Sequence, residues 1–452
     1  MRDFIEDAIK GKDADYLEIR VEESQASHIR YQGKELDGIG SNNGKGGNIR
    51  ALVGGGWGFV CFNELSGLRD KVEQAIHQAR LVNGPNRRLA PVEPVVDIVK
   101  PHIVRDPATI SILDKKQYLD EYNEIIWSTP NIQSSVIGYQ DSRKKRYFAN
   151  SEGSYIEQER IDVTLRVMAI AQRNGDVQQA GFSVGSLGDV NLIKTLHDDV
   201  ADISQKAVDM LAAPSVDGKQ YTVVLDPILA GVFIHEAFGH LSEADHVYEN
   251  NHLQEIMVLG KRFGGTHLNV VDGGAVPSLR GSFQYDDEGT AATRTYLIKE
   301  GELVGRLHSR ETAGKMGEAV TGNARSISYN FPPIVRMTNT FIEPGRDTVK
   351  DILSDIKDGI YVKNWYGGMT SLEMFTFSAG EAYRIRNGKI EEMVRPVMLS
   401  GNLFSTLKNL DAIANDLEMN EGGGCGKGGQ SPLPVSNGSP HIRIQKCLVG
   451  GS

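Results

Sequence analysis

One segment, DPILAGVFIHEAFGH (Asp226 to His240), constrains the fold more than any other part of the chain. Asp226 followed by Pro227 is a good helix start, because an acidic N-cap precedes proline at the first helical position. The residues that follow are apolar on nearly all sides of a helix, which predicts that the helix is buried. Polar groups inside such a helix are costly unless something satisfies them. The segment therefore predicts a core built around a helix that carries two histidines and a glutamate.

The spacing of the two histidines is unusual. Zinc hydrolases commonly place two histidines four residues apart on one helix, whereas His235 and His240 are five residues apart. Five residues turn an undistorted helix by roughly 140°, so these side chains could not reach one ion. Two distortions would bring them together: a π-bulge, which adds a residue to one turn, or a helix that ends at Gly239 and lets the chain swing His240 back. A single histidine here would be an ordinary core residue, but two histidines that flank Glu236 favour a metal site.

A catalytic zinc usually has three protein ligands and an open position for water, so two histidines are too few. Glu243, Asp245 and His246 are nearby candidates, and the first two could instead orient a ligand histidine or cap the helix end. Cys425, in the distant segment NEGGGCGKGGQSP, lies between glycines. A cysteine in so flexible a frame does not fill a core, and a role as a thiolate ligand would explain it. The alternative is an unimportant surface thiol.

The pattern of strands and helices predicts an α+β fold in two halves, each with a mixed or antiparallel sheet and helices on one side. Short strands separated by glycine-rich turns are expected over the first sixty residues or so. The polar segment Ala213–Gln220 contains proline and glycine and marks a boundary. We therefore predict an N-terminal α+β domain at 1–212 and a C-terminal domain at 213–452, with the histidine helix at its start. Hairpin turns are expected at Glu300–Gly301 and Asn387–Gly388.

The composition limits the partners that the chain can have. The formal net charge is -10, and the longest basic block, Arg143–Arg146, is interpreted as a solvated turn, so nucleic acid is not expected as a partner. The N-terminus lacks the apolar core of a signal peptide, and no apolar run approaches the roughly 18 residues of a membrane span. Cys61, Cys425 and Cys447 are far apart and odd in number, which fits a reducing compartment. Cys61 and Cys447 are expected to pack in strands, and the location is expected to be cytoplasmic.

Further blocks of sequence accompany the histidine segment and the cysteine loop. With HEAFGHLSEAD and GGCGKGGQ, they resemble the TldD/PmbA family of metalloproteases in kind and in order, and the resemblance covers nearly the whole chain. The blocks are GGWGFV near residue 55, YDDEGTAATRTYLIKEGELVG from Tyr285, TGNAR from Thr321, RMTNTFIEPG from Arg336 and SGNLFSTLKNL from Ser400.

The resemblance implies a fold and a chemistry. The family has a catalytic member and a related member that lacks the metal residues, and this chain resembles the catalytic, TldD-like member. By that resemblance His235, His240 and Cys425 would ligate Zn²⁺, and Glu236 would be the catalytic acid/base. Family members pair into homodimers or heterodimers that enclose the active site, have an α+β fold in two halves, and act on unfolded or unstructured peptides.

The main hypothesis is a zinc-dependent peptidase. A peptide-binding or regulatory module with a structural zinc is the alternative, and it would need a fourth protein ligand such as Glu243 or His246. A zinc hydrolase of small amides is a third possibility, which an enclosed chamber too narrow for a peptide would favour. Arg325, Arg336 and Asn339 lie in blocks that resemble the family, but the sequence gives them no role, and structural ion pairs are as good an explanation as substrate contacts.

Overall fold

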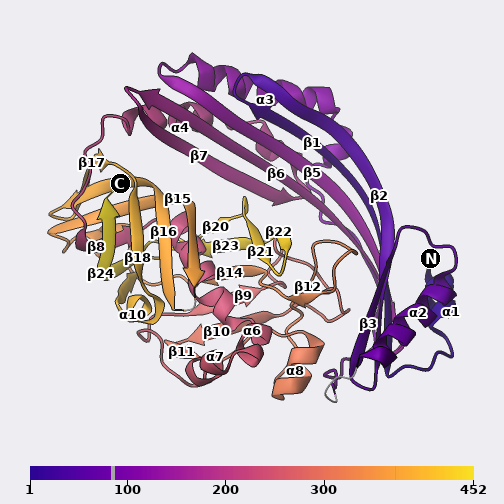
Figure 1. Cartoon of the computed structure of the whole chain (residues 1–452). Helices are drawn as coiled ribbons and strands as arrows, with labels where there is room; N and C mark the ends of the chain where they lie inside the picture. Colours follow the sequence, from indigo (N-terminus) through magenta and orange to yellow (C-terminus); the bar gives the residue numbers. More distant parts are fainter. Residues whose placement is uncertain (83–86, 372, 452) are drawn as a thin grey trace.

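A large, curved sheet forms most of the N-terminal half in the computed structural model, which describes residues 1–82, 87–371 and 373–451 (Figure 1). Its strand order is β3-β2-β1-β5-β6-β4, with β7 beside β6, and only the β4–β6 pair is parallel. The strands are β1 (Tyr16–Gln32), β2 (Glu35–Val53), β3 (Gly56–Phe62), β4 (Val96–Val99), β5 (Ile132–Asn150), β6 (Tyr155–Arg173) and β7 (Asp176–Leu187).

Helices cover only one face of this sheet. Along β5, Ile137 and Tyr139 pack in the core under the helices, whereas Gly138 and Gln140 face a cavity on the other side, as the alternation of side chains along a strand requires. The expected arrangement of helices on one side is therefore confirmed for this half. The helices are α1 (Arg2–Ile9), α2 (Leu68–Leu81), α3 (Ile112–Ser128) and α4 (His197–Asp209), with short 3₁₀ turns at Pro107–Thr109 and Val190–Ile193.

The prediction of short strands separated by glycine-rich turns is wrong for β1 and β2, which are 17 and 19 residues long, although the chain does turn between them at Gly33, whose φ is +63°. It holds for the turn into the short β3, where Gly54 and Gly55 have positive φ. The glycines between these two turns lie inside β2, paired with β1. At Gly46 a Cβ atom would lie 2.3 Å from the ring of Tyr329, so glycine serves close packing there and not a turn.

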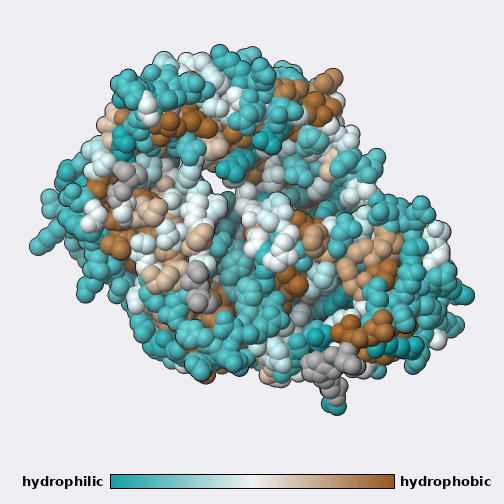
Figure 2. Space-filling view, viewed as in Figure 1, coloured by the Kyte–Doolittle hydropathy of each residue, from teal (hydrophilic) through white to brown (hydrophobic). Residues whose placement is uncertain are grey.

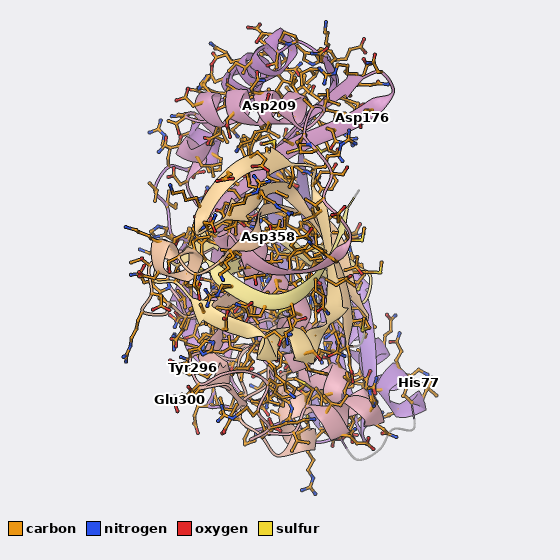
Figure 3. The ribbon with its side chains drawn as sticks, turned by 90° about the vertical axis from the view of Figure 1, so that its left-hand side faces the viewer. His77, Asp176, Asp209, Tyr296, Glu300 and Asp358 are labelled. Atoms are coloured by element: carbon orange, nitrogen blue, oxygen red, sulfur yellow. The ribbon has the colours of Figure 1, made fainter. Side chains whose placement is uncertain are left out.

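Two sheets build the C-terminal half. One has the order β11-β10-β9-β14-β23-β20, and the other has the order β15-β8-β24-β18-β16-β17. Because β15 also pairs with β16, the strands β15, β8, β24, β18 and β16 close into a barrel. This part of the molecule faces the viewer in Figure 3, where Asp358 is labelled. The strands are β8 (Lys219–Leu225), β9 (Val270–Gly273), β10 (Arg294–Lys299), β11 (Glu302–Leu303), β14 (Asn339–Ile342), β15 (Asp358–Ser371), β16 (Met374–Arg386), β17 (Lys389–Val394), β18 (Val397–Asn402), β19 (Leu410–Ile413), β20 (Glu418–Asn420), β23 (Ser436–Ser439) and β24 (Ile442–Gly451).

Smaller elements complete this half. Two separate two-stranded ladders are formed by β12 (Ala324–Arg325) with β13 (Ile334–Val335), and by β21 (Gly424–Lys427) with β22 (Gln430–Pro434). The helices are α5 (Pro227–Ile234), α6 (Ala244–Glu249), α7 (Asn251–Ile256), α8 (Arg310–Met316), α9 (Val349–Leu353) and α10 (Leu403–Lys408). The fold is α+β, as predicted, whereas the division at residue 213 stays a prediction.

α5 lies at the centre of the C-terminal core, between the two large sheets. The Asp226 side chain caps it by accepting a hydrogen bond from the backbone N–H of Leu229 at 2.8 Å. Phe233 packs edge-on against Phe375 and Phe377 of β16. At Gly231 a Cβ atom would lie 2.8 Å from the backbone of β23, so only glycine permits this close crossing. The predicted start and burial of the helix are confirmed.

Other expectations have mixed outcomes. Both hairpin turns are confirmed, because Glu300, Gly301, Asn387 and Gly388 all have positive φ, as a type I′ turn requires. The interpretation of Arg143–Arg146 as a solvated turn is wrong: these residues lie inside β5, and their side chains pair with carboxylates.

The ion pairs of this basic block include Arg146 with Asp287 at 2.6 Å.

Packing is confirmed for Cys447, but Cys61 is exposed on β3, contrary to the prediction. None of the helices in the described ranges is both long and apolar enough to cross a membrane.

Candidate metal centre

A π-helical turn at His235–Gly239 follows α5 and is itself followed by a 3₁₀ turn at His240–Ser242. The backbone N–H of His240 donates to the carbonyl oxygen of His235, which closes the wider i→i+5 turn. The two imidazole rings then lie side by side in an edge-on arrangement, with centroids 5.4 Å apart and planes at 80°. The predicted π-bulge is confirmed. The alternative, a helix that ends at Gly239, is wrong because Gly239 keeps right-handed helical angles.

Gly239 lets another segment approach this turn. A Cβ atom at Gly239 would lie 2.0 Å from the sulfur of Met337, far inside van der Waals contact. Glycine at this position therefore allows the segment around Met337 to pack directly against the turn that carries the histidines.

The third candidate ligand comes from the hairpin of β21 and β22. Cys425 lies opposite Leu433, and the hairpin turns at Gly428 and Gly429, which both have positive φ. The Cys425 side chain is buried, with 3% of the residue exposed, so its interpretation as a surface thiol is wrong. Its Sγ lies 3.5 Å from Nε2 of His240, and the ligand atoms of the two histidines and the cysteine all lie within 4.8 Å of one another.

Electrostatics in this cluster favours a thiolate. Burial would raise the pKa of the Cys425 thiol, but the charge of His235 and hydrogen bonds from both histidines lower that pKa to about 5. For the two imidazoles, burial alone would lower the pKa. The Cys425 thiolate reverses this and raises the pKa of His235, and Glu243 raises the pKa of His240 well above its usual value. A thiolate is the form in which cysteine binds a metal.

The cluster has the donors of a metal site. Imidazole nitrogen and thiolate sulfur are both atoms that bind zinc in proteins. Nδ1 of His235 is buried and has no hydrogen-bond partner among the described residues. An imidazole nitrogen left unsatisfied in a core is costly, and a cation bound by this cluster would offset that cost.

Glu236 occupies the accessible side of the cluster. Its carboxylate oxygen Oε2 lies 4.0 Å from Nε2 of His240, and 29% of its side chain is exposed, whereas His235 and Cys425 are buried. The carboxylate therefore lies beside the candidate ligands, where solvent can reach it.

The buried carboxylate of Glu243 binds the Nδ1 side of the His240 ring. Oε2 of Glu243 accepts from Nδ1 of His240 at 3.0 Å, which leaves Nε2 to face Cys425. Burial would raise the pKa of Glu243, but His240 and Lys427 lower that pKa to about 2. The orienting role is thus seen for Glu243 but not for Asp245, which binds Lys427 at 2.7 Å. His246 is not part of the group of three.

Lys427 is a site residue that sequence reasoning missed. Its Nζ lies 3.1 Å from Glu243 and 2.9 Å from the carbonyl oxygen of Val335, so it ties the cysteine hairpin to the histidine segment. The sequence signal that could have indicated Lys427 as a site residue is its position two residues after Cys425.

We predict that Glu243→Gln weakens metal binding about 10- to 100-fold, as is typical when a partner behind a ligand histidine is changed. The substitution preserves size but removes the charge that fixes the imidazole. Competition with a chelator of known affinity measures the effect, with Glu249→Gln, an exposed change of the same kind on α6, as the control. Metal affinity equal to that of the control would contradict this role.

A cavity of about 1380 Å³ opens between the exposed face of the N-terminal sheet and the C-terminal half (Figure 2). On the sheet, β5 contributes alternate residues from Gly138 to Arg146, which are mostly polar, and β6 contributes both polar and apolar residues between Gln158 and Met168. On the opposite side the cavity reaches Gly424, the neighbour of Cys425. The hollow thus extends to the hairpin that carries the candidate thiolate, although Cys425 and the two histidines do not themselves line it.

The two arginines of the family-like blocks do not form the ion pairs that were one of the two expectations, whereas substrate contacts stay a prediction. Arg325 donates to the carbonyl oxygens of Met337 and Pro434, and Arg336 donates to those of Cys425 and Gln430. Neither has a carboxylate partner in the part of the chain that the structure describes. Asn339 bonds to the main chain of Gly273 and Gly281.

The chain is similar to known proteins over nearly its whole length. Profiles of the PmbA/TldA metallopeptidase match in three parts: domain 1 at residues 17–79, the central domain at 105–213 and the C-terminal domain at 218–451. A metalloprotease of Synechocystis is 48% identical and the match covers 97% of this chain and 95% of that protein. A zinc metalloprotease TldD homologue of Saccharolobus solfataricus is 30% identical, over 97% of each chain. The solved structure of TldE from Thermococcus kodakarensis has the same fold, with a TM-score of 0.77, 18% identity and full coverage of both chains.

Proposed function

Because the chain belongs to the PmbA/TldD family of metalloproteases, we propose that it is a zinc-dependent peptidase that hydrolyses unfolded peptides. The observation that carries this proposal is the convergence of His235, His240 and Cys425, with Glu236 on their accessible side. When bound to these three residues, zinc would supply a water of lowered pKa and polarise the scissile carbonyl.

The residues of the chain divide the remaining work. Glu236 takes the proton from the attacking water and passes it to the leaving amine. Glu243 holds His240 in the tautomer whose Nε2 faces the site. Cys425 contributes a negative charge, so the site is a weaker Lewis acid than three neutral imidazoles would be. We therefore expect modest turnover.

The size and lining of the cavity support a peptide as the substrate. Pockets for small molecules commonly span about 300–1,000 Å³, and the cavity of about 1380 Å³ exceeds that range. Its wall combines polar and charged side chains, which offer hydrogen bonds, with apolar and aromatic side chains such as Phe182, Phe283 and Trp365. The size and the mixed lining favour an extended peptide over a small amide.

A structural zinc would need a fourth protein ligand. Among the described residues, no other histidine, cysteine or carboxylate joins the group of three. Glu243 uses Oε2 for His240 and Lys427, and it is not among the residues whose ligand atoms come together. The site therefore favours an open position for water, which supports the peptidase over the regulatory module.

The direct test is zinc content together with cleavage of an unfolded peptide. We expect about one zinc per chain, and hydrolysis of a chemically unfolded protein but not of the same protein in its native fold. Zinc without cleavage, even after a metal-free relative is added, would favour the regulatory module. Cleavage of small amides alone would favour the third hypothesis.

We further propose that the chain works as a dimer, with a second copy or with a metal-free relative. Four apolar side chains are exposed on one face of the barrel, where the strand register places them on the same side: Met369, Met374, Met398 and Leu448. Exposed apolar patches of this kind mark interaction surfaces. We predict that Met398→Lys with Leu448→Lys lowers the mass in solution from dimer to monomer, as sedimentation equilibrium measures. An unchanged mass would place the contact elsewhere.

A further inference from the structure

The buried segment Val335–Met337 lies between the two parts of the candidate metal centre. On one side Met337 packs against Gly239 in the turn that carries the histidines. On the other side the carbonyl oxygen of Val335 accepts from Nζ of Lys427, two residues after Cys425. Both the histidine turn and the cysteine hairpin are therefore in contact with the same three residues.

Arg336, in the middle of this segment, binds the cysteine hairpin directly. Its Nη2 donates to the carbonyl oxygen of Cys425 at 2.8 Å, and its Nη1 donates to the carbonyl oxygen of Gln430 at 3.2 Å. These acceptors lie on the two strands of the hairpin, β21 and β22. The rigid planar fork of a guanidinium suits two acceptors at fixed positions, which the point charge of a lysine does not.

The burial of Arg336 is expensive. The residue is fully buried, and it has no carboxylate partner within the described ranges. Buried charges are normally paired, so a cation here that bonds only to carbonyl oxygens must be offset by what those bonds achieve. The backbone of Arg336 is itself fixed by Asn323, whose carbonyl oxygen accepts from the Arg336 N–H at 2.9 Å and whose side chain donates to the Arg336 carbonyl at 3.0 Å.

The hairpin needs such a restraint. β21 and β22 pair only with each other in the described structure and not with either large sheet. An isolated two-stranded hairpin is marginally stable in water. With glycines before and after Cys425, the position of its Sγ depends on side-chain contacts to the hairpin, and Arg336 makes the contact closest to the cysteine backbone.

We propose that Arg336 is the positioning residue of the metal centre: by binding the hairpin from the segment that packs on the histidine turn, it sets the distance between Cys425 and the two histidines. The inference rests on the proposed zinc site, and it adds a residue that touches neither metal nor substrate. Arg336 acts through the geometry of Cys425 alone, so its loss changes how the thiolate binds a metal before it changes the fold.

The test compares Arg336→Lys with Arg310→Lys in the full-length chain. Arg310 of α8 is the control, because it is also fully buried and donates to a backbone carbonyl, that of Ala90, but makes no bond to the hairpin or to Val335–Met337 in the described structure. The first readout is Zn²⁺ affinity by chelator competition. The second is the thiolate-to-metal charge-transfer absorption of the Co²⁺-loaded protein, which reports whether the sulfur is bound.

We expect Arg336→Lys to lose about 10- to 100-fold in Zn²⁺ affinity and to show a weakened charge-transfer band at saturating Co²⁺. We expect Arg310→Lys to retain both within about threefold. Thermal unfolding of the metal-free proteins corrects for lost stability. Equal affinities and equal bands in the two variants overturn the inference while leaving the zinc site intact, whereas a wild-type protein that binds no metal overturns the proposed function as well.

If Arg336→Lys does not accumulate as folded protein, Lys427→Met removes a second bond between this segment and the hairpin, at a position nearer the surface. A loss of Zn²⁺ affinity and of the Co²⁺ band supports the role of the segment. Wild-type values for both in folded Lys427→Met overturn it.

Discussion

Glu236→Gln is expected to abolish peptide hydrolysis while zinc stays bound. The glutamine keeps the shape of the side chain but cannot accept the proton of the attacking water. General acid–base catalysis typically contributes 10²–10⁴-fold, and we expect kcat/KM on an unfolded peptide to fall by about that factor. Because His235, His240 and Cys425 remain, the zinc content should equal that of the wild type.

The control for this experiment is Glu249→Gln, which makes the same chemical change on the exposed side of α6. Its activity should stay within about twofold of the wild type. Retained activity in Glu236→Gln would exclude Glu236 as the acid/base. Loss of zinc together with activity would instead give Glu236 a role in holding the metal.

Cys425→Ser is expected to lose both the metal and the activity. The substitution changes one atom but replaces a buried thiolate by a neutral hydroxyl, a poor ligand for zinc. Structural zinc is bound with roughly 10–16 kcal/mol. If the three ligands contribute equally to this binding free energy, each contributes about 3–5 kcal/mol. The loss of one ligand then lowers the affinity for zinc on the order of 10²–10⁴-fold. Elemental analysis of the purified protein and chelator competition measure it.

Cys61→Ser is the matched control, because it makes the same change at the exposed thiol of β3. It should bind zinc like the wild type, and a chelator should inactivate both. Full zinc content in Cys425→Ser would show that the thiolate is not a ligand and that the two histidines find their third partner elsewhere.

The central feature of the site was predictable because the sequence contained a geometric conflict. His235 and His240 cannot both point at one ion from a regular helix, so their spacing predicted a distortion. The π-helical turn at His235–Gly239 is that distortion. The capped start at Asp226 and the type I′ turn at Asn387–Gly388 were equally predictable, because each depends on local backbone chemistry.

Other features depend on contacts between distant residues and leave no local pattern. The bond from Arg336 to the Cys425 carbonyl joins residues 89 positions apart, and its acceptor is the backbone, which every residue has. The glycines of β2 suggested turns because glycine permits them, but Gly46 instead makes room for the ring of Tyr329. The basic block in β5 looked solvated because its carboxylate partners are distant in sequence, such as Glu22 on β1 and Asp287 in the other half of the chain.

The most direct test of the account is an anomalous difference map from crystals of the zinc-loaded protein, with data collected on either side of the zinc absorption edge. We predict one peak about 2.3 Å from Sγ of Cys425 and about 2.0–2.1 Å from one nitrogen each of His235 and His240, with the Glu236 carboxylate beside the remaining position. A peak that contacts only one of the two histidines, or that lies away from this cluster, would contradict the claim that the π-turn builds a catalytic zinc site.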